Sequence, residues 1–255
     1  TPEAAAYWQT EVVRLKERLE KEFSVTITDD ALHQAIALAN EERRSLKDLQ
    51  DTCKAVPSPI TGSDLLLAMF MRNYTLDKRI AISIIDKLTA ELRDMVRRGE
   101  GAVSETSPRI LITGVPTGVG SDKVVKIIEQ SGGSVVCFEN CTGYKKVIDP
   151  VAVDADPIKA IADKYLKTPC SCMSPNTGRF ELVEQLCREF SIDGVVDLTW
   201  QACHTYNIES HSLKKYLQTK LSIPFMQLET DYSESDTEQL KVRIEAFLEM
   251  IGSRK

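Results

Sequence analysis

This 255-residue sequence has no long apolar run, no excess of positive charge and no basic-then-apolar segment at its start. Without eighteen consecutive apolar residues, it contains no candidate membrane-spanning helix. Its 32 Lys and Arg residues are outnumbered by 38 Asp and Glu, and the net charge of −6 disfavours binding to nucleic acid or to an anionic membrane surface. Without a secretory signal, we expect a cytoplasmic protein with neither a nucleic acid nor a membrane as partner.

An even, closely spaced set of cysteines is also missing, because the sequence has seven and only Cys53 lies in its first half. A disulfide framework is typical of a short, loop-rich secreted chain with an even number. This chain is larger and rich in predicted helix. We therefore expect reduced thiols, some of which are metal ligands.

Residues 1–106 have the apolar periodicity of α-helices. Trp8, Val12, Leu15 and Leu19, for example, fall on one helical face. Residues 99–108 are rich in Gly and Ser and end in Pro108, which is typical of a linker. We expect a helical segment over 1–106 and a second domain over 107–255.

The second domain alternates short apolar runs with helical patterns. The predicted strands are 109–113, 134–138, 194–199 and 224–228, and the helices that follow them include 121–130, 178–190, 210–221 and 236–251. Such alternation predicts crossover connections and a parallel sheet that is covered on both faces. The expected fold is α/β, with a four-stranded parallel sheet of the flavodoxin or Rossmann type.

Four cysteines fall in loops that could reach one edge of this sheet. Cys141 follows the second strand and Cys203 follows the third, while Cys170 and Cys172 lie in a loop between two helices. Ligands of open parallel sheets bind beyond the carboxyl ends of the strands. The spacing matches neither a ferredoxin run nor a zinc ribbon. The residues alone leave open whether these thiols bind metal or are small packing residues.

The other three cysteines have a structural interpretation. Cys137 lies within a strand, Cys187 lies within a helix, and Cys53 lies at a helix end. We expect them to be core residues.

A glycine-rich turn follows the first strand and includes Gly114, Gly118 and Gly120. A strand, a turn and a helix start form the usual context for anion binding, so a phosphate, a CoA pyrophosphate or a cluster sulfide is a candidate ligand. The turn matches neither a nucleotide-triphosphate loop nor G-x-G-x-x-G. A tight turn without a ligand is the alternative.

Two further residues are candidates for proton transfer. His204 is adjacent to Cys203, and Glu229 ends the fourth strand. The alternatives are a hydrogen-bonded structural histidine and a carboxylate that caps a loop.

Four ordered motifs carry a resemblance to a known family. They are ENCTG at 139–143, CSCMSPN at 170–176, QACHTY at 201–206 and LETDY at 228–232. Together they resemble the 2-hydroxyglutaryl-CoA dehydratase D-component and benzoyl-CoA reductase family, and within it the double-cubane cluster proteins. The resemblance covers nearly the whole chain.

The resemblance implies an iron–sulfur cofactor, either [4Fe-4S] or an [8Fe-9S] double cubane, and an ATP-hydrolysing iron–sulfur activator protein as the electron donor. It also implies a homodimer or a related subunit as partner and an acyl-CoA as substrate. Cys203 matches a family cluster ligand, and Cys141 and Cys170 match the additional cysteines of the double-cubane branch. Cys172 is the ambiguous member of its pair.

The family also has an N-terminal α/β lobe with further cysteine ligands, which this sequence does not show. Since the chain begins with Thr1, we expect it to be the C-terminal portion of a longer protein, with little or no cluster and no activity by itself. Two other functions remain open: a non-catalytic flavodoxin-like module that binds phosphate, and a structural zinc-binding domain.

Overall fold

The computed structural model describes residues 1–253, and its elements alternate as expected for an α/β protein. The strands are β1 (Arg109–Gly114), β2 (Ser134–Phe138), β3 (Gly194–Trp200) and β4 (Phe225–Thr230). The α-helices of the described chain are α1 (Pro2–Phe23), α2 (Asp29–Asp51), α3 (Gly62–Met71), α4 (Lys78–Arg97), α5 (Lys123–Gln130), α6 (Tyr144–Val147), α7 (Pro157–Leu166), α8 (Thr177–Glu189), α9 (His204–Leu221) and α10 (Thr237–Gly252).

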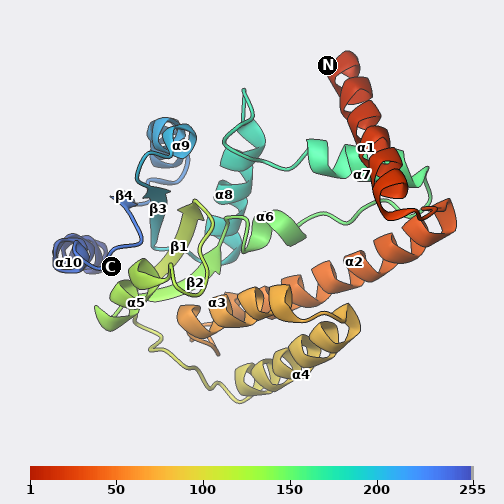
Figure 1. The fold of residues 1–255 in the computed structure, drawn as a ribbon. Helices are drawn as coiled ribbons and strands as arrows, with labels where there is room; N and C mark the ends of the chain where they lie inside the picture. Colours follow the sequence, from red (N-terminus) through yellow and green to blue (C-terminus); the bar gives the residue numbers. More distant parts are fainter. Residues whose placement is uncertain (254–255) are drawn as a thin grey trace.

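The four strands form one parallel sheet in the order β2-β1-β3-β4. Side chains of β1, β2 and most of β3 are buried on both faces, which explains why these strands are continuous apolar runs rather than alternating ones. Helices α5 and α10 pack together on one face, and α8 and α9 pack together on the other (Figure 1). The prediction of a flavodoxin-like or Rossmann-like sheet is confirmed.

Helices α2, α3 and α4 pack on one another and beside the edge of this sheet. Helix α2 packs along α4, and α3 contacts β2 and α5. Leu46, Leu65 and Met69 belong to the same hydrophobic core as the strands. The division of the chain at residue 106 into two domains stays a prediction.

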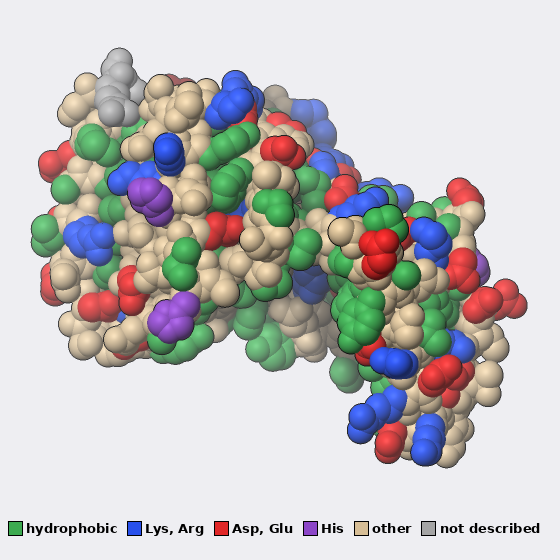
Figure 2. All heavy atoms as spheres, turned by 90° about the horizontal axis from the view of Figure 1, so that it is seen from above, with side chains coloured by type: hydrophobic (Ala, Val, Ile, Leu, Met, Phe, Trp, Pro, Cys, Tyr) green, Lys and Arg blue, Asp and Glu red, His purple; other side chains and the backbone are tan. Residues whose placement is uncertain are grey.

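Helix α1 lies apart from this core. None of its residues is fully buried, and its main contact is with α7, where Trp8 Nε1 donates a hydrogen bond to the carbonyl oxygen of Ala162 at 3.1 Å. Seen from above, α1, α7 and the adjoining end of α2 form the narrower part of the molecule, beside the broader part that contains the sheet (Figure 2).

The expected start of one helix is wrong. Helix α9 begins at His204, not near Ser210, so the loop after β3 is only three residues long. Residues 204–209 contain neither Gly nor Pro, and the helix extends back to Cys203, whose carbonyl accepts a hydrogen bond from the Asn207 backbone N–H at 3.1 Å.

No helix within residues 1–253 is long and apolar enough to cross a lipid bilayer.

Candidate functional site

The strand order places a crevice between the carboxyl ends of β1 and β3. The chain leaves β1 toward β2 on one side and returns to β3 on the other, and this reversal is where open α/β sheets bind their ligands. Thr113 of β1 and Asp197 of β3 are register partners there, and both are fully buried. The cysteine loops lie around this edge of the sheet.

Asn140 fixes the loop that carries Cys141. Its side chain is fully buried and donates hydrogen bonds to the carbonyl oxygen of Val115 and to Thr117 Oγ1, both at 3.0 Å. Its Oδ1 accepts a hydrogen bond from the backbone N–H of Thr142 at 3.1 Å. The loop after β2 is therefore tied to the glycine-rich turn after β1, with Cys141 exposed between them.

The loop between α7 and α8 reaches the first turn of α9, next to Cys203. Ser171 Oγ donates a hydrogen bond to Thr205 Oγ1 at 3.1 Å. Thr205 Oγ1 in turn lies 3.8 Å from Cys203 Sγ. The prediction that the cysteine loops meet at one edge of the sheet requires such a contact between the segments around Cys170 and Cys203, which are more than thirty residues apart.

Three of the four thiols interact without forming a closed metal site. Cys141 and Cys172 both interact electrostatically with Cys170. Burial raises the pKa of Cys141. Burial also acts to raise the pKa of Cys170, but hydrogen bonding to Cys172 and the charge of Lys145 together outweigh it, and the net shift is downward. Within residues 1–253, no three His, Cys, Asp or Glu side chains are close enough to hold a metal ion. Ligation by Cys141, Cys170, Cys172 and Cys203 stays a prediction.

The remaining cysteines are core residues, as the sequence predicts. Cys53, Cys137 and Cys187 are at most 2% exposed. Burial raises the pKa of Cys53 to about 11 and that of Cys187 to about 12. These thiols stay protonated at neutral pH, so they are unsuited to binding metal.

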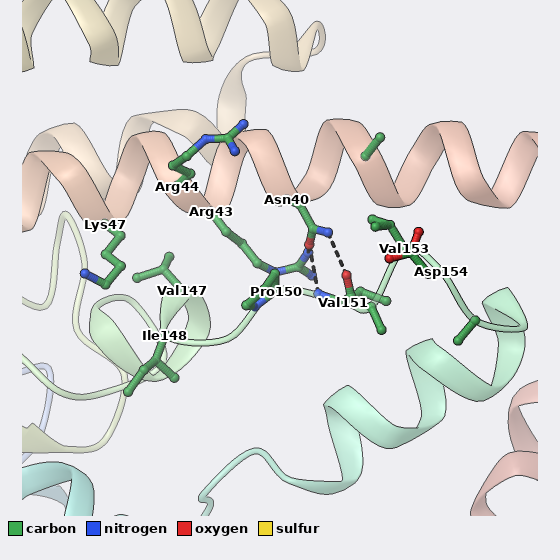
Figure 3. Close-up of a pocket in the computed structure, with 13 residues that line it drawn as sticks. Asn40, Arg43, Arg44, Lys47, Val147, Ile148, Pro150, Val151, Val153 and Asp154 are labelled. Carbon is green, nitrogen blue, oxygen red and sulfur yellow. Dashed lines mark hydrogen bonds between the residues drawn. The ribbon is translucent and has the colours of Figure 1, made fainter.

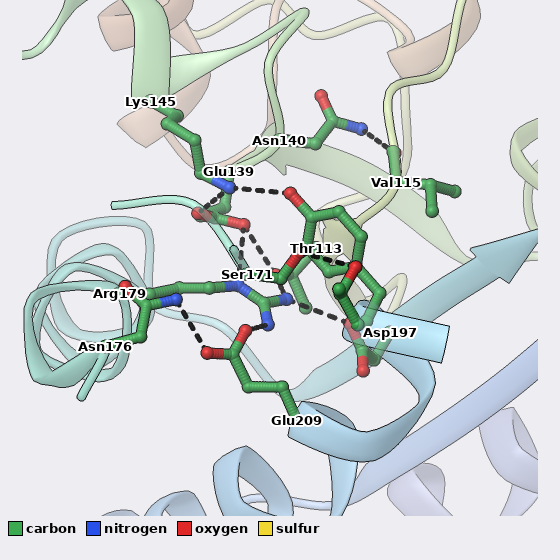
Figure 4. A network of polar contacts seen from close by, with 12 residues as sticks. Thr113, Val115, Glu139, Asn140, Lys145, Ser171, Asn176, Arg179, Asp197 and Glu209 are labelled. Atoms are coloured by element: carbon green, nitrogen blue, oxygen red, sulfur yellow. Dashed lines mark hydrogen bonds and ion pairs between the residues drawn. The ribbon is translucent and has the colours of Figure 1, made fainter. Parts of the chain in front are cut away.

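A network of buried charges lies beneath the cysteine loops, with Arg179 at its centre (Figure 4). The Arg179 side chain is 0% exposed. Its Nη2 donates to Thr113 Oγ1 at 2.8 Å and to Asp197 Oδ1 at 3.1 Å, its Nε lies 3.7 Å from Glu139 Oε2, and its Nη1 donates to Glu209 Oε2. We call Arg179, Thr113, Asp197, Glu139, Glu209 and Lys145 the Arg179 network.

Lys145 is the second cation of this network. Its ammonium group lies 3.0 Å from Glu139 Oε1 and donates a hydrogen bond to the Tyr206 hydroxyl at 3.2 Å. Glu139 also accepts a hydrogen bond from Thr113 at 2.6 Å. Burial raises the pKa of Glu139, but Lys145 and Arg179 outweigh burial and the net shift is downward. Glu139 is therefore held as a carboxylate.

The pKa of Asp197 is shifted upward, in the opposite direction to that of Glu139. Burial raises its pKa, and the attraction of Arg179 does not fully compensate. Its Oδ2 has no hydrogen-bond partner in the part of the chain that the structure describes. The Arg179 network therefore contains one firmly ionised carboxylate and one that burial destabilises as an anion.

The Arg179 network joins the three cysteine-bearing segments. Glu139 precedes Cys141 by two residues, Arg179 is at the start of the helix that follows Cys172, and Glu209 is on the helix that follows Cys203. Glu139 lies within the ENCTG motif, whereas Arg179 and Glu209 lie outside the four motifs, and no role was predicted for any of the three residues. One available signal was the aspartate in the otherwise apolar strand 194–199.

Two of the three glycines in the turn after β1 are explained by packing. Gly114 has a φ of +100°, and a Cβ there would lie 2.1 Å from the Leu198 carbonyl oxygen. A Cβ at Gly118 would lie 2.4 Å from the Phe70 ring. Gly120 has a φ of +87° with open space around it. A cofactor-binding role for these glycines stays a prediction, and the tight-turn alternative has direct structural support.

The two proton-transfer candidates are exposed near the start of α9. His204 is its first residue, next to Cys203, and Glu229 accepts a hydrogen bond from Asn207 Nδ2 at 2.7 Å. Glu229 therefore connects the end of β4 to α9. Their catalytic roles stay predictions.

Comparison with known proteins finds similarity to dehydratase subunits. The family described as 2-hydroxyglutaryl-CoA dehydratase, D-component, matches residues 1–251. The chain is 43% identical over 246 residues to the putative dehydratase subunit YjiM of Escherichia coli K12, covering 96% of this chain and 64% of that protein. It is 23% identical over 237 residues to the (R)-phenyllactyl-CoA dehydratase beta subunit of Clostridium sporogenes, covering 92% of this chain and 61% of that protein. The chain thus spans less than two-thirds of the length of these relatives.

Proposed function

Because this chain belongs to the 2-hydroxyglutaryl-CoA dehydratase D-component family, we propose that it is the cluster-binding part of a 2-hydroxyacyl-CoA dehydratase or related low-potential reductase subunit, of the double-cubane type. The proposed substrate class is an acyl-CoA, which is consistent with the name of the clostridial relative, a subunit of a phenyllactyl-CoA dehydratase. The observation that carries the proposal is the contact of Ser171 with Thr205, which joins the loop of Cys170 and Cys172 to the start of α9 beside Cys203.

The proposed ligands are Cys141, Cys170 and Cys203, with Cys172 as the alternative to Cys170. Their chemistry fits an iron–sulfur cluster, because all four are free thiols on loops with access to solvent, unlike the cysteines of the core. Lys145 adds a positive charge that favours the thiolate forms of Cys141 and Cys170. A bound cluster would supply one-electron transfer.

Residues around these thiols are assigned to binding and to proton transfer. We assign proton transfer to His204 and Glu229, which flank the start of α9. The turn from Gly114 to Gly120 is the proposed approach for a phosphate group of the substrate. The proposed partners are an ATP-hydrolysing iron–sulfur activator and a second subunit, and the proposed location is the cytoplasm. The clostridial relative is described as a beta subunit, which supports the second of these partners.

The test uses the complete gene product that carries this chain, purified without oxygen, in its original form and as Cys203→Ser. The control is Cys187→Ala, because this thiol is 2% exposed in the core. We expect Cys203→Ser to lose iron, sulfide and visible absorbance while Cys187→Ala keeps them.

Equal iron and sulfide contents in the Cys203→Ser variant and the original protein would contradict the ligand assignment. Zinc in place of iron in the original protein would support the structural zinc alternative.

A further inference from the structure

A pocket lies away from the crevice, between α2 and the segment that joins α6 to α7 (Figure 3). Its volume is about 830 Å³, which is within the range of small-molecule binding sites. The segment 147–155 contributes an apolar floor, made mainly of Val147, Ile148, Pro150 and Val151. Helix α2 contributes the polar wall.

This pocket is held in shape by Asn40. The Asn40 side chain donates a hydrogen bond to the Val151 carbonyl oxygen at 2.8 Å and accepts one from the Val151 backbone N–H at 2.9 Å (Figure 3). The two bonds attach the irregular segment to α2 through both backbone polar groups of one residue. The pocket is therefore formed before any ligand arrives.

Arg43 extends from α2 over the floor of the pocket (Figure 3). Its guanidinium donates to Asn40 Oδ1 at 2.9 Å and to the Tyr165 hydroxyl at 3.2 Å, which are both neutral acceptors. No carboxylate within residues 1–253 forms an ion pair with Arg43. A guanidinium has five N–H donors, so several remain for an incoming anion.

Arg43 contributes positive charge to the surroundings of two lysines. The pKa of Lys164, which is 8% exposed, is lowered mainly by burial; the attraction of Asp149 opposes this shift, and the repulsion of Arg43 adds to it. The pKa of Lys146 is also lowered mainly by burial, with Arg43 among the smaller contributions in the same direction.

Three other charged residues line the pocket: Arg44, Lys47 and Asp154. The charge of Lys47 is partly compensated, because its ammonium group lies 2.7 Å from Asp51 Oδ2. Asp154 is the acidic side chain of the lining. The lining therefore carries more positive than negative charge, which favours an anionic ligand.

We propose that this pocket binds a phosphorylated small molecule, with its phosphate on Arg43 and its apolar portion on the floor formed by residues 147–153. A phosphate accepts paired hydrogen bonds from a guanidinium and carries a larger charge than a carboxylate. The flat, aliphatic floor matches an adenine ring or an alkyl chain. The proposal does not depend on bound iron, so it stands or falls separately from the proposed cluster.

Isothermal titration calorimetry tests the proposal with this chain at low ionic strength, using CoA, ADP and inorganic phosphate as probes. The variants are Arg43→Met, which removes the charge and keeps the length, and Arg43→Lys, which keeps a charge without the fork. The control is Arg188→Met, which removes an exposed arginine paired with Glu184 on α8. Thermal unfolding of each variant verifies that it remains folded.

We expect CoA or ADP to bind the original chain, with the affinity falling by about tenfold or more in Arg43→Met, by less in Arg43→Lys and not in Arg188→Met. Binding of CoA but not of ADP identifies a CoA-type ligand, and equal binding identifies a nucleotide. The proposal is overturned if neither binds, if folded Arg43→Met binds as well as the original chain, or if inorganic phosphate binds as tightly as CoA, because the floor then contributes nothing.

Discussion

Replacing Arg179 by Met should destabilise the protein more than the loss of any exposed ion pair. Arg179 is 0% exposed and faces Glu139 and Asp197, both also 0% exposed. Removing one partner of a buried ion pair costs about 3–5 kcal/mol, because the other charge stays buried without compensation. Folded domains are stable by about 5–15 kcal/mol, so the variant should fold with a much smaller margin.

The destabilisation should depend on pH in a defined direction. Without Arg179, the pKa values of Glu139 and Asp197 should rise in the folded state. A carboxylate whose pKa is raised by folding lowers the stability as the pH rises, because the unfolded chain ionises first. In the original protein the pKa of Glu139 is lowered, so its contribution is present above the ordinary pKa of a glutamate and is lost on acidification. The difference between variant and original should therefore be larger at pH 8 than at pH 5.

Urea unfolding followed by circular dichroism at both pH values measures this difference. The control is Arg188→Met, since the Arg188 side chain is 61% exposed and its pair with Glu184 should contribute less than about 1 kcal/mol. If Arg179→Met unfolds within about 1 kcal/mol of the original protein and shows no added pH dependence, the Arg179 network does not stabilise this edge of the sheet.

Two further predictions concern the same edge of the sheet. Gly114→Ala should lower the unfolding free energy by at least about 3 kcal/mol, because the residue has a φ of +100° and its Cβ would lie 2.1 Å from the Leu198 carbonyl oxygen. Gly120→Ala has open space around it and should lower the unfolding free energy by about 1 kcal/mol. Equal losses of unfolding free energy in chemical denaturation would contradict this geometry. In the native, metal-free chain, the exposed Cys141 should react with a chromogenic disulfide reagent. Cys137 is 1% exposed and burial raises its pKa, so it should react only after denaturation. Mass spectrometry of the labelled peptides identifies the reactive cysteines, and labelling of Cys137 in the native chain would show that the core is open.

Much of the fold could be predicted from the sequence because the first three strands are nearly continuous apolar runs. The runs at 109–113, 134–138 and 194–199 match β1, β2 and β3 within one residue at each end. The start of helix α9 was harder to predict. Residues 204–209 contain only Tyr206 and Ile208 as apolar side chains, and this spacing does not mark an apolar helical face. Its six additional residues became visible only through the backbone hydrogen bonds.

The candidate site was predictable only in part. Loops after parallel strands meet at one edge of the sheet, which is why Cys141 and Cys203 could be assigned to the same region. The Arg179 network could not be predicted, because it joins Arg179 to side chains 18 to 66 residues away, with no periodic spacing in the sequence. The pocket beside Arg43 was missed for the same reason, since Asn40 and Val151 are 111 residues apart.

Cross-linking of the metal-free chain with a short bifunctional thiol reagent is the most direct test that the three thiol-bearing loops gather at one edge of the sheet. Peptide mass spectrometry then identifies the joined cysteines. We expect cross-links from Cys203 to Cys170 or Cys172 and from Cys141 to one of these two. If Cys203 and Cys141 are each labelled singly, and the only link is between the near neighbours Cys170 and Cys172, the thiols are too far apart to hold a common cluster.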